Sequence, residues 1–585
     1  MKELNEILSQ IIKEAFNKCG YSENVGNVVP CVLEGFGDFQ CNDAMPLAKI
    51  YKKNPMVIAE EVVDKITDKT VIEKVEVARP GFINITLNSK FLSEYIGEYI
   101  LDIIVDKKTN ENKDVFMIDY GGPNVAKPLH IGHLRSAIIG ESLKRITKYM
   151  GYNVLGDVHF GDWGRQMGMV IMGIKRKYPN LPYFDENYTG EYPAECPVDI
   201  EELENIYPEE NERAKHDEKI MEEDKKATFE LQNGRRGYVA LWKSFLALSV
   251  ADVKSIYDEL DVSFDLWLGE SDAHKYVDEL LTELKNKKLL KQSEGALVVD
   301  VEKEGDKIKV PPCLILKSDG AVMYATTDLA TIIMRKKELN AKNILYITDN
   351  RQNLHFMQVF RVAEQMGLDK DIEFKHIGFG TMNGKDGKPY KTRDGGVMKL
   401  RALIDEIKQK AQSKIRLSDT SITPDKAKEI VNAVFLATLK FADLSNLVTK
   451  DYIFDIDKFS EFEGKTGPYL LYTITRIKSM LNKCNFNGKV KSLPNVYSDI
   501  EKQILLNISS FNHTLKNAFN DKSPSYLCDM AYKLANLYST FYASFNVVNE
   551  KDENVKQSRI TLSYYTLQTL EKLLYLLGIK TIDKM

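Results

Sequence analysis

The chain has 585 residues, of which 43% are hydrophobic and 28% are charged, a balance typical of a globular protein with three or four domains. No apolar run is long enough to span a membrane, and the opening segment Met1–Tyr21 carries Glu and Asn within its apolar pattern, which argues against a secretory signal. The seven cysteines are scattered without a C-x-x-C pair, so we expect a cytoplasmic protein with neither a disulfide framework nor a zinc knuckle.

Residues 1 to 112 are predicted to form a separate α+β domain. Apolar residues recur at helical spacing from Leu4 to Phe16, which predicts a first helix. Residues 71–77 and 82–87 then alternate between apolar and polar and are joined by Arg79-Pro80-Gly81. This pattern is typical of two strands and a turn.

Residues 113 to 410 are predicted to form an α/β domain. Val115–Ile118 is a short apolar strand, residues 121–128 form a loop rich in Gly, Pro and Asn, and a helical pattern runs from Ile131 to Met150. A strand, a glycine-rich loop and a helix in this order open a nucleotide-binding unit. The α/β pattern resumes at residues 314–317, 322–325 and 344–347.

An insertion is expected within this domain at about residues 176–240. Residues 195–226 hold thirteen Asp or Glu against five Lys or Arg, and a solvated helical surface explains such a charge run without a further function. The net charge of the whole chain is −5. This total does not suggest a nucleic-acid partner, although it can hide a local basic groove.

Residues 411 to 585 are predicted to form a helical bundle. Strong helical periodicity occurs at residues 430–441, 469–480 and 527–545. The chain is therefore expected to combine two α/β-type domains with an all-α domain.

The motif His130-Ile131-Gly132-His133 lies where the predicted loop becomes the predicted helix. Two histidines three residues apart share one face of a helix, next to unpaired N–H groups and the positive end of the helix dipole. Such a place binds phosphate, and imidazoles can donate hydrogen bonds to charge that develops there. A zinc pair is an alternative reading, but no third ligand is suggested nearby, so we expect no metal bound by the protein itself.

A longer run around this motif resembles the signature of arginyl-tRNA synthetases, a class I family. It comprises Pro123-Asn124-Val125-Ala126-Lys127-Pro128-Leu129 before the motif and Leu134-Arg135-Ser136 after it. The resemblance covers about nine-tenths of the chain and includes Gly161-Asp162-Trp163-Gly164 with Gln166, Phe39-Gln40-Cys41-Asn42, Asp451-Tyr452-Ile453-Phe454-Asp455 and Gly467-Pro468-Tyr469-Leu470.

This resemblance implies a Rossmann-like class I catalytic domain with an N-terminal tRNA-binding α+β domain and a C-terminal helical anticodon-binding domain. It also implies the activity: ATP, with Mg²⁺, activates L-arginine to arginyl-adenylate, and the arginyl group passes to the 3′ adenosine of tRNA(Arg). We expect a monomer that does not bind membranes. The ATP site is expected to include His130, Gly132, His133 and His355.

The second class I signature, a lysine-rich loop, is degenerate here. Lys388, Lys391 and Arg393 occupy its place, but the Met-Ser centre between the lysines is missing. Lys127 lies three residues before the first histidine and is a further candidate, alongside the two histidines, for the catalytic set. Each of these cations could instead be an exposed loop charge.

The resemblance also assigns the arginine site. A planar, permanently charged guanidinium requires carboxylates placed for paired hydrogen bonds. Tyr324 and Asp328 are four apart and would face the same way on a helical turn. Each residue alone has a simpler explanation, such as an N-cap, but together we assign arginine binding to Asp119, Asn124, Tyr324, Asp328 and Gln352.

Contacts to tRNA are expected in both flanking domains. Aromatic rings can stack on extruded bases and amides can read their edges, whereas ordinary core packing explains the same residues about as well. Two other functions remain open, another class I synthetase and a non-catalytic tRNA-binding paralogue; the missing zinc ligands argue against the first and the intact histidines against the second. The predicted tRNA contacts are Phe82, Asn84, Tyr469, Tyr472, Tyr538 and Tyr542.

Overall fold

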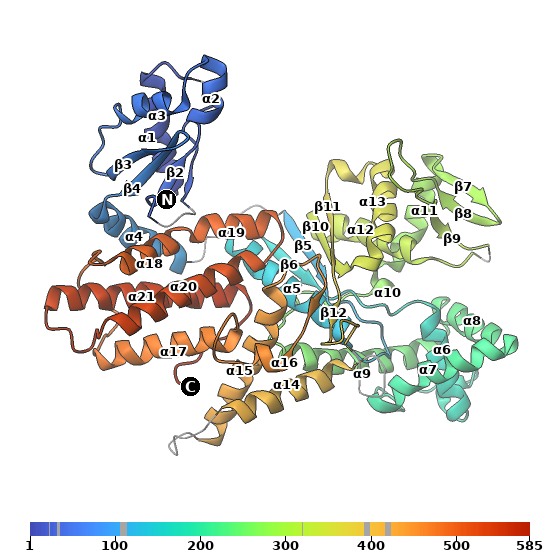
Figure 1. Ribbon diagram of the computed structural model, residues 1–585. Coiled ribbons are helices and arrows are strands. Elements are labelled where there is room, and N and C mark those ends of the chain that lie inside the picture. The colour runs from blue at the N-terminus through green and yellow to red at the C-terminus, as the bar shows by residue number, and fades with distance from the viewer. Residues whose placement is uncertain (23, 32–34, 106–113, 319, 391–397, 416–422) are drawn as a thin grey trace. The chain divides into compact units, whose positions relative to one another are not determined.

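The computed structural model describes residues 1 to 585 except residues 23, 32–34, 106–113, 319, 391–397 and 416–422 (Figure 1). The chain forms two units. Met1–Lys107, Thr423–Ala437 and Glu461–Met585 make up the first, and Lys108–Ile422 and Thr438–Ser460 make up the second. The predicted limits at residues 112 and 410 stay a prediction.

The N-terminal part of the first unit is an antiparallel sheet with helices, and the predicted strand pair 71–77 and 82–87 is confirmed. The strand order is β1-β2-β4-β3. Ile83, Ile85 and Leu87 share one face of β4 and are fully buried, and α1 buries a stripe of apolar residues at helical spacing. The elements are α1 (Leu4–Lys18), β1 (Val28–Pro30), β2 (Phe39–Cys41), α2 (Ala44–Tyr51), α3 (Pro55–Val63), β3 (Ile72–Ala78), β4 (Phe82–Leu87) and α4 (Ser89–Ile104).

The C-terminal part of the first unit is a bundle of helices, as the periodicity predicts. Helices α17, α20 and α21 pack side by side (Figure 1), and each buries several apolar residues, Leu among them, at helical spacing. None of the helices in the described part of the chain has the length and apolar character needed to cross a membrane. The bundle contains α17 (Gly467–Lys483), α18 (Asp499–Ser509), α19 (Phe511–Asn520), α20 (Ser525–Ser544) and α21 (Glu553–Leu576).

The second unit is built on a four-stranded parallel sheet with the order β11-β10-β5-β6. Its strands are β5 (Val115–Tyr120), β6 (Val154–Asp157), β10 (Ala341–Asp349) and β11 (Glu373–Phe379). After β5 the chain crosses to β6 on one side of it, and it later returns to β10 on the other side. The carboxyl ends of β5 and β10 therefore form a topological switch point, where ligands bind in open α/β sheets.

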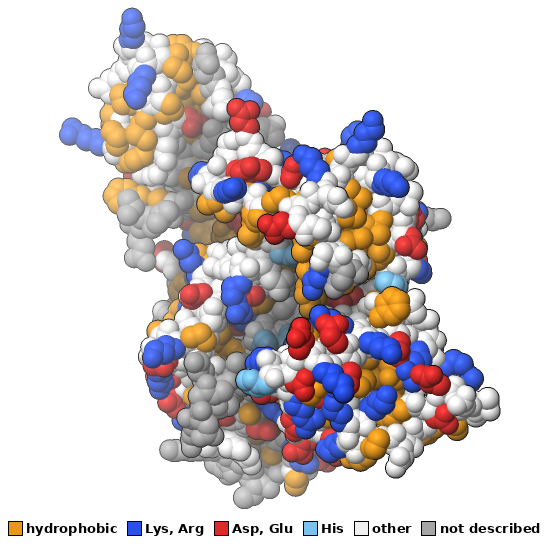
Figure 2. Space-filling view, turned by 90° about the vertical axis from the view of Figure 1, so that its right-hand side faces the viewer, with side chains coloured by type: hydrophobic (Ala, Val, Ile, Leu, Met, Phe, Trp, Pro, Cys, Tyr) orange, Lys and Arg blue, Asp and Glu red, His pale blue; other side chains and the backbone are white. Residues whose placement is uncertain are grey.

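Helices and two small sheets surround this parallel sheet, and the predicted fold class is confirmed. Helix α5 (Ile131–Tyr149) follows β5 as expected, and the insertion contributes α7 (Ile200–His216) and α8 (Glu218–Gln232). Figure 2 shows basic and acidic side chains interleaved over the face of this unit that points toward the viewer. The other elements are α6 (Arg165–Lys177), α9 (Arg236–Glu259), α10 (Glu270–Ala273), α11 (Val277–Asn286), β7 (Leu290–Ser293), β8 (Ala296–Val299), β9 (Cys313–Leu316), α12 (Tyr324–Leu339), α13 (Asn353–Met366), β12 (Met382–Asn383), α14 (Leu400–Lys414), β13 (Tyr452–Ile453) and α16 (Ile456–Phe459). Helix α15 (Pro424–Leu444) is divided between the two units.

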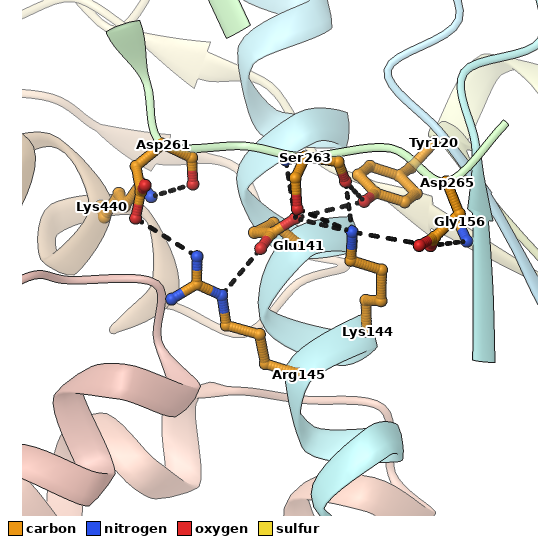
Figure 3. A network of polar contacts seen from close by, with 9 residues as sticks. All are labelled: Tyr120, Glu141, Lys144, Arg145, Gly156, Asp261, Ser263, Asp265 and Lys440. Carbon is orange, nitrogen blue, oxygen red and sulfur yellow. Dashed lines mark hydrogen bonds and ion pairs between the residues drawn. The ribbon is translucent and has the colours of Figure 1, made fainter. Parts of the chain in front are cut away.

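A polar network holds the second half of α5 in place (Figure 3). The buried Glu141 carboxylate pairs with Arg145 at 2.7 Å and Lys144 at 3.3 Å, and it accepts a hydrogen bond from the Ser263 N–H at 3.0 Å. Burial alone would raise the pKa of Glu141, but the charges of Lys144 and Arg145 outweigh burial and hold that pKa below its usual value. The helix that carries the histidine motif is thus fixed along its length.

Candidate active site

The loop after β5 and the first turn of α5 are fastened to the neighbouring strand by Ser136. Its hydroxyl donates to the Ile347 carbonyl of β10 at 2.6 Å and accepts from the Gly121 N–H at 2.7 Å. Both groups are buried, so each bond satisfies a polar atom that would otherwise be desolvated without a partner. The histidine motif is thereby placed at the switch point between β5 and β10.

The two histidines of the motif cap their own helix. The Nδ1 atom of His130 accepts from the Gly132 N–H at 3.0 Å, and the Nδ1 atom of His133 accepts from the His130 N–H at 3.1 Å. With Nδ1 as acceptor in each ring, the proton of each neutral imidazole lies on Nε2, which remains a donor. A side chain at Gly132 would place its Cβ 2.8 Å from the His130 ring, so only glycine fits between them.

Both imidazoles are neutral at physiological pH. Burial, with the charges of Arg351 and Lys127, lowers the pKa of His130, and burial with the neighbouring His130 lowers the pKa of His133 to about 3. The ring centroids are 4.0 Å apart. The site therefore offers two neighbouring N–H donors at a helix N-terminus, an arrangement suited to phosphate oxygens.

Arg135 connects the first turn of α5 with the segment that leads to the lysine loop. Its buried guanidinium pairs with Asp443 at 3.0 Å and donates to the carbonyl oxygens of Gly380 at 2.5 Å and Lys450 at 3.3 Å. Gly380 lies two residues before the start of β12, from which the chain continues to Lys388. Arg135, which follows the two histidines in the signature, thus has a structural role: it ties the start of α5 to the segment that leads to the lysine loop.

The carboxylate of Asp328 lies at the start of α12, one turn after Tyr324, as the spacing predicts. In the described part of the chain its close ion-pair partner is His355 of α13, with 2.5 Å between Nε2 and Oδ2. The Tyr324 side chain is 65% exposed, and Gln352 is exposed at the end of β10. The structure therefore brings Asp328 of the predicted arginine site and His355 of the predicted ATP site into contact.

Asn124 is held beside Gly161 through a parallel bridge, and the Val125 N–H donates to the Gly161 carbonyl at 3.1 Å. A Cβ at Gly161 would lie 2.4 Å from the Asn124 side-chain oxygen, so the close approach requires glycine. The segment 123–129 before the histidine motif and the segment 161–166 are thus in direct contact.

Asp119 has a partner within the protein. One Arg335 nitrogen lies 2.6 Å from Asp119 and 2.6 Å from Asp157, and His159 lies 3.6 Å from Asp157. Burial disfavours charge on His159, but the nearby carboxylates of Asp157 and Asp119 outweigh burial and raise the pKa of the imidazole to about 9. Asp119, Asp157 and His159 also lie close enough together to hold a metal ion, but the buried Arg335 guanidinium occupies the place of such a cation. The role of Asp119 in arginine binding stays a prediction.

Sequence reasoning missed Glu270, the first residue of α10. Burial raises the pKa of its carboxyl to about 7; His159 opposes this shift, and the negative charges of Asp328 and Asp162 add to it. Burial, together with the negative charge of Glu270, raises the pKa of the Tyr324 hydroxyl, and α10 packs against α12, the helix that carries both Tyr324 and Asp328. Glu270 lies 58 residues before Asp328, so no local spacing connects the two.

Three family models match this chain. They are described as "tRNA synthetases class I (R), catalytic domain" over residues 99–456, "DALR anticodon binding domain" over residues 470–585 and "Arginyl tRNA synthetase N terminal domain" over residues 2–87. The chain is 47% identical to an arginine–tRNA ligase of Alkaliphilus oremlandii over 588 residues and 45% identical to one of Francisella tularensis over 591 residues, with 100% of each chain covered.

The chain belongs to the arginyl-tRNA synthetase family.

Solved structures agree with this membership. The crystal structure of arginyl-tRNA synthetase from Plasmodium falciparum superposes with a TM-score of 0.81 at 26% identity and full coverage of both chains. The Thermus thermophilus arginyl-tRNA synthetase has the same fold, with a TM-score of 0.78 at 20% identity and full coverage.

Of the cations predicted to act in catalysis, Lys127 packs against an aromatic ring, whereas the Lys388 side chain is exposed. The Lys127 ammonium lies 4.4 Å from the ring centroid of Tyr207 in α7, next to the histidine motif. Lys388 is exposed at the turn after β12, where its carbonyl accepts from the Gly384 N–H at 2.8 Å. Lys391 and Arg393 lie outside the described residues.

In the N-terminal sheet, the two predicted tRNA contacts differ in exposure. Phe82 is half-buried, whereas Asn84 is buried and its side-chain oxygen accepts from Gln40 Nε2 at 2.7 Å. The amide of Asn84 is thus engaged within the sheet. Core packing, the alternative left open by the sequence, describes Asn84 in this structure.

Among the four predicted tyrosines of the bundle, two form a surface cluster. Tyr472 and Tyr542 are 41% and 38% exposed, and the Arg476 guanidinium lies 4.5 Å and 5.1 Å from their ring centroids. Tyr469 is half-buried and hydrogen-bonded to Asn536 and Ser539. Tyr538 is fully buried and donates to Ser563 at 3.1 Å, so its ring is a core residue and has no free face for a base.

Proposed function

We propose that this protein is an arginine–tRNA ligase. It activates L-arginine with ATP to arginyl-adenylate and pyrophosphate, and it then transfers the arginyl group to the 3′ adenosine of tRNA(Arg) with release of AMP. The full-length similarity to arginine–tRNA ligases carries the proposal. The chemistry of the site supports it, because the N–H donors of the histidine motif suit phosphate oxygens and the carboxylates of Asp328 and Glu270 suit a guanidinium.

In the first step, the arginine carboxylate attacks the α-phosphorus of ATP and the bond to pyrophosphate breaks. His130 and His133 donate their Nε2–H groups to oxygens on which negative charge increases, and the N-terminus of α5 adds its dipole. Neutral donors keep this role across the physiological pH range, since the pKa of His133 is about 3. Lys127 and Lys388, with Lys391 and Arg393, are assigned to the leaving pyrophosphate.

In this proposal Asp328 exchanges His355 for the substrate guanidinium, and Tyr324 and Glu270 complete the pocket. A guanidinium next to Glu270 would relieve the repulsion between its carboxylate and that of Asp328. Asn124 and Gln352 are assigned to the α-amino and carboxylate end of arginine, and Asp119 stays assigned to the same site. His355, once released, is free to line the adenosine of ATP.

Mg²⁺ would accompany ATP and be held mainly by its phosphates, because this small, hard cation binds through few protein ligands. When bound, it neutralises phosphate charge. The cationic side chain of Lys127 beside the histidine motif is suited to phosphate oxygens, and the motif itself offers no carboxylate oxygen of the kind that Mg²⁺ prefers.

The Tyr472–Arg476–Tyr542 cluster is proposed to stack on bases of the anticodon loop, and Phe82 is proposed to stack on a base elsewhere in tRNA(Arg). We also propose that the protein acts as a monomer in the cytoplasm. The seven scattered cysteines suit a reducing compartment.

Exchange of radioactive pyrophosphate into ATP tests the function. Each of the twenty standard amino acids is supplied in turn, with and without tRNA(Arg), and the charging of tRNA is measured in parallel. Arginine alone should support both reactions. Activity with a different amino acid would identify another class I synthetase, and tRNA binding without any exchange would identify a non-catalytic tRNA-binding protein.

A further inference from the structure

The backbone of Lys399 lies beside His130. The two residues form an antiparallel bridge, and the next N–H along, that of Leu400, donates to the Leu129 carbonyl at 2.8 Å. Opposed residues of an antiparallel pair start about 5 Å apart at Cβ and direct their side chains to the same face. The Lys399 side chain therefore starts next to the His130 ring.

One face of the insertion helix α7 contacts both lysines near the histidine motif. The Glu204 carboxylate lies 2.7 Å from the Lys399 ammonium, and the Tyr207 ring lies under the Lys127 ammonium. Glu204 and Tyr207 are three residues apart, so they share one helix face. Two separate contacts thus place this face against the cations that flank the motif.

Helix α7 is fixed independently of these contacts. The carboxylate of Glu210, which is fully buried, pairs with Arg176 of α6, and Glu202 pairs with Lys177 of the same helix. The Glu204 side chain is only 13% exposed, whereas the Lys399 side chain is 56% exposed. Lys399 is thus held on one side by a largely desolvated carboxylate and remains accessible on the other.

We propose that Lys399 is a further phosphate-contacting residue of the activation reaction, and that Glu204 and Tyr207 hold Lys399 and Lys127 until the phosphates of ATP replace them. This inference rests on the proposed function, because it requires ATP at the histidine motif. A triphosphate carries more negative charge than one carboxylate, so both lysines gain a stronger partner when ATP binds. The acidic insertion thereby acquires a role at the active site.

Three variants test the inference: Lys399→Met removes the cation, Glu204→Gln releases it, and Glu202→Gln is the matched control. Glu202→Gln removes a charge and an ion pair from the same helix, away from the motif. Arginine-dependent pyrophosphate exchange is measured with tRNA(Arg) present and ATP varied. Lys399→Met should lower kcat/KM for ATP by about tenfold or more and change KM for arginine less than about twofold.

Glu204→Gln should lower KM for ATP by about threefold, and Glu202→Gln should leave it unchanged. The double variant Lys399→Met/Glu204→Gln should match Lys399→Met alone, because Glu204 acts through Lys399. Wild-type ATP kinetics in Lys399→Met would overturn the inference, as would equal effects of Glu204→Gln and Glu202→Gln.

Equilibrium binding of ATP, which requires neither arginine nor tRNA, separates this inference from the proposed function. If the wild-type protein lacks arginine-dependent exchange but Lys399→Met still binds ATP about tenfold more weakly, the proposed function fails and the role of Lys399 stands. If exchange is normal and ATP binds equally well to both proteins, the inference fails and the proposed function stands.

Discussion

The two sides of the candidate active site handle charge in opposite ways. On the phosphate side, His130 and His133 are kept neutral by burial and by nearby positive charge, and they present N–H donors at a helix N-terminus. On the amino-acid side, burial raises the pKa of Glu270 to about 7, and the negative charge of Asp328 adds to this shift. One side thus supplies donors without charge, and the other concentrates negative charge.

This difference follows from what each side has to recognise. Charge that appears on phosphate only during the reaction is best met by fixed dipoles, which need no reorganisation when it develops. A guanidinium is charged before it binds, so its pocket can hold carboxylates that are unfavourable to each other until the ligand arrives. Changes on the amino-acid side should therefore alter arginine binding, and changes on the phosphate side should alter rate.

The largest effect is expected for Asp328→Asn, which keeps the shape of the side chain and removes its charge. The loss of a charge-assisted pair in a closed site costs about 2–5 kcal/mol, so kcat/KM for arginine should fall by about 30-fold to several thousand-fold while KM for ATP stays the same. Steady-state kinetics with each substrate varied measure this. Glu338→Gln, which removes an exposed carboxylate from the same helix, is the control, and an unchanged KM and rate for arginine in Asp328→Asn would contradict the assignment.

His133→Ala should reveal the opposite behaviour on the phosphate side. Removal of one fixed donor to developing charge typically slows a reaction by about 100- to 1,000-fold, so adenylate formation should slow by this amount with little change in arginine affinity. Single-turnover rates from pH 6 to pH 8 test this. Because the pKa of His133 is about 3, protonation of this residue does not affect the rate in that range. His513 is an exposed histidine in α19, and His513→Ala should behave as wild type. A wild-type rate in His133→Ala as well would rule out the donor role.

Much of the fold and of the phosphate side could be predicted because the relevant signals are local. The strand at Val115, the loop after it and the helix from Ile131 are consecutive in sequence, and each has its own periodicity. The structure confirms β5 and α5 within one or two residues of the predicted limits. The α12 turn that aligns Tyr324 with Asp328 is confirmed for the same reason.

The remaining features depend on contacts between distant segments, which periodicity does not encode. The pKa of Glu270 is raised only because tertiary packing buries its carboxyl, and Lys399 lies at the motif only because its backbone pairs with His130. The burial of Tyr538 likewise depends on α21, which supplies its Ser563 partner. In each case the residue type is ordinary at its position, and tertiary packing determines its role.

Lys127→Ala tests whether the phosphate side also uses permanent charge. The Lys127 ammonium lies over Tyr207, next to the motif, and its loss should slow adenylate formation by about tenfold, or about 1.4 kcal/mol of barrier, with little effect on arginine affinity. Its effect should be non-additive with Lys391→Ala if both stabilise the same leaving pyrophosphate. Lys148→Ala, an exposed lysine at the far end of α5, is the control. A wild-type rate for Lys127→Ala would mean that this lysine is ordinary surface charge.

The smallest effect is expected from the titration of Glu270 in the free enzyme. Its pKa is raised to about 7, so its carboxyl is ionised at pH 8 and mostly protonated at pH 6, where it no longer attracts a guanidinium. The value of kcat/KM for arginine, which reports groups of the free enzyme, should fall by up to about tenfold between these pH values. Glu270→Gln should give a low value that varies little over the same range, whereas Glu279→Gln, which removes an exposed carboxylate of α11, should keep the wild-type profile. If Glu270→Gln retains the wild-type pH dependence, the titrating group is elsewhere, and the negative charge of the arginine side would rest on Asp328 without Glu270.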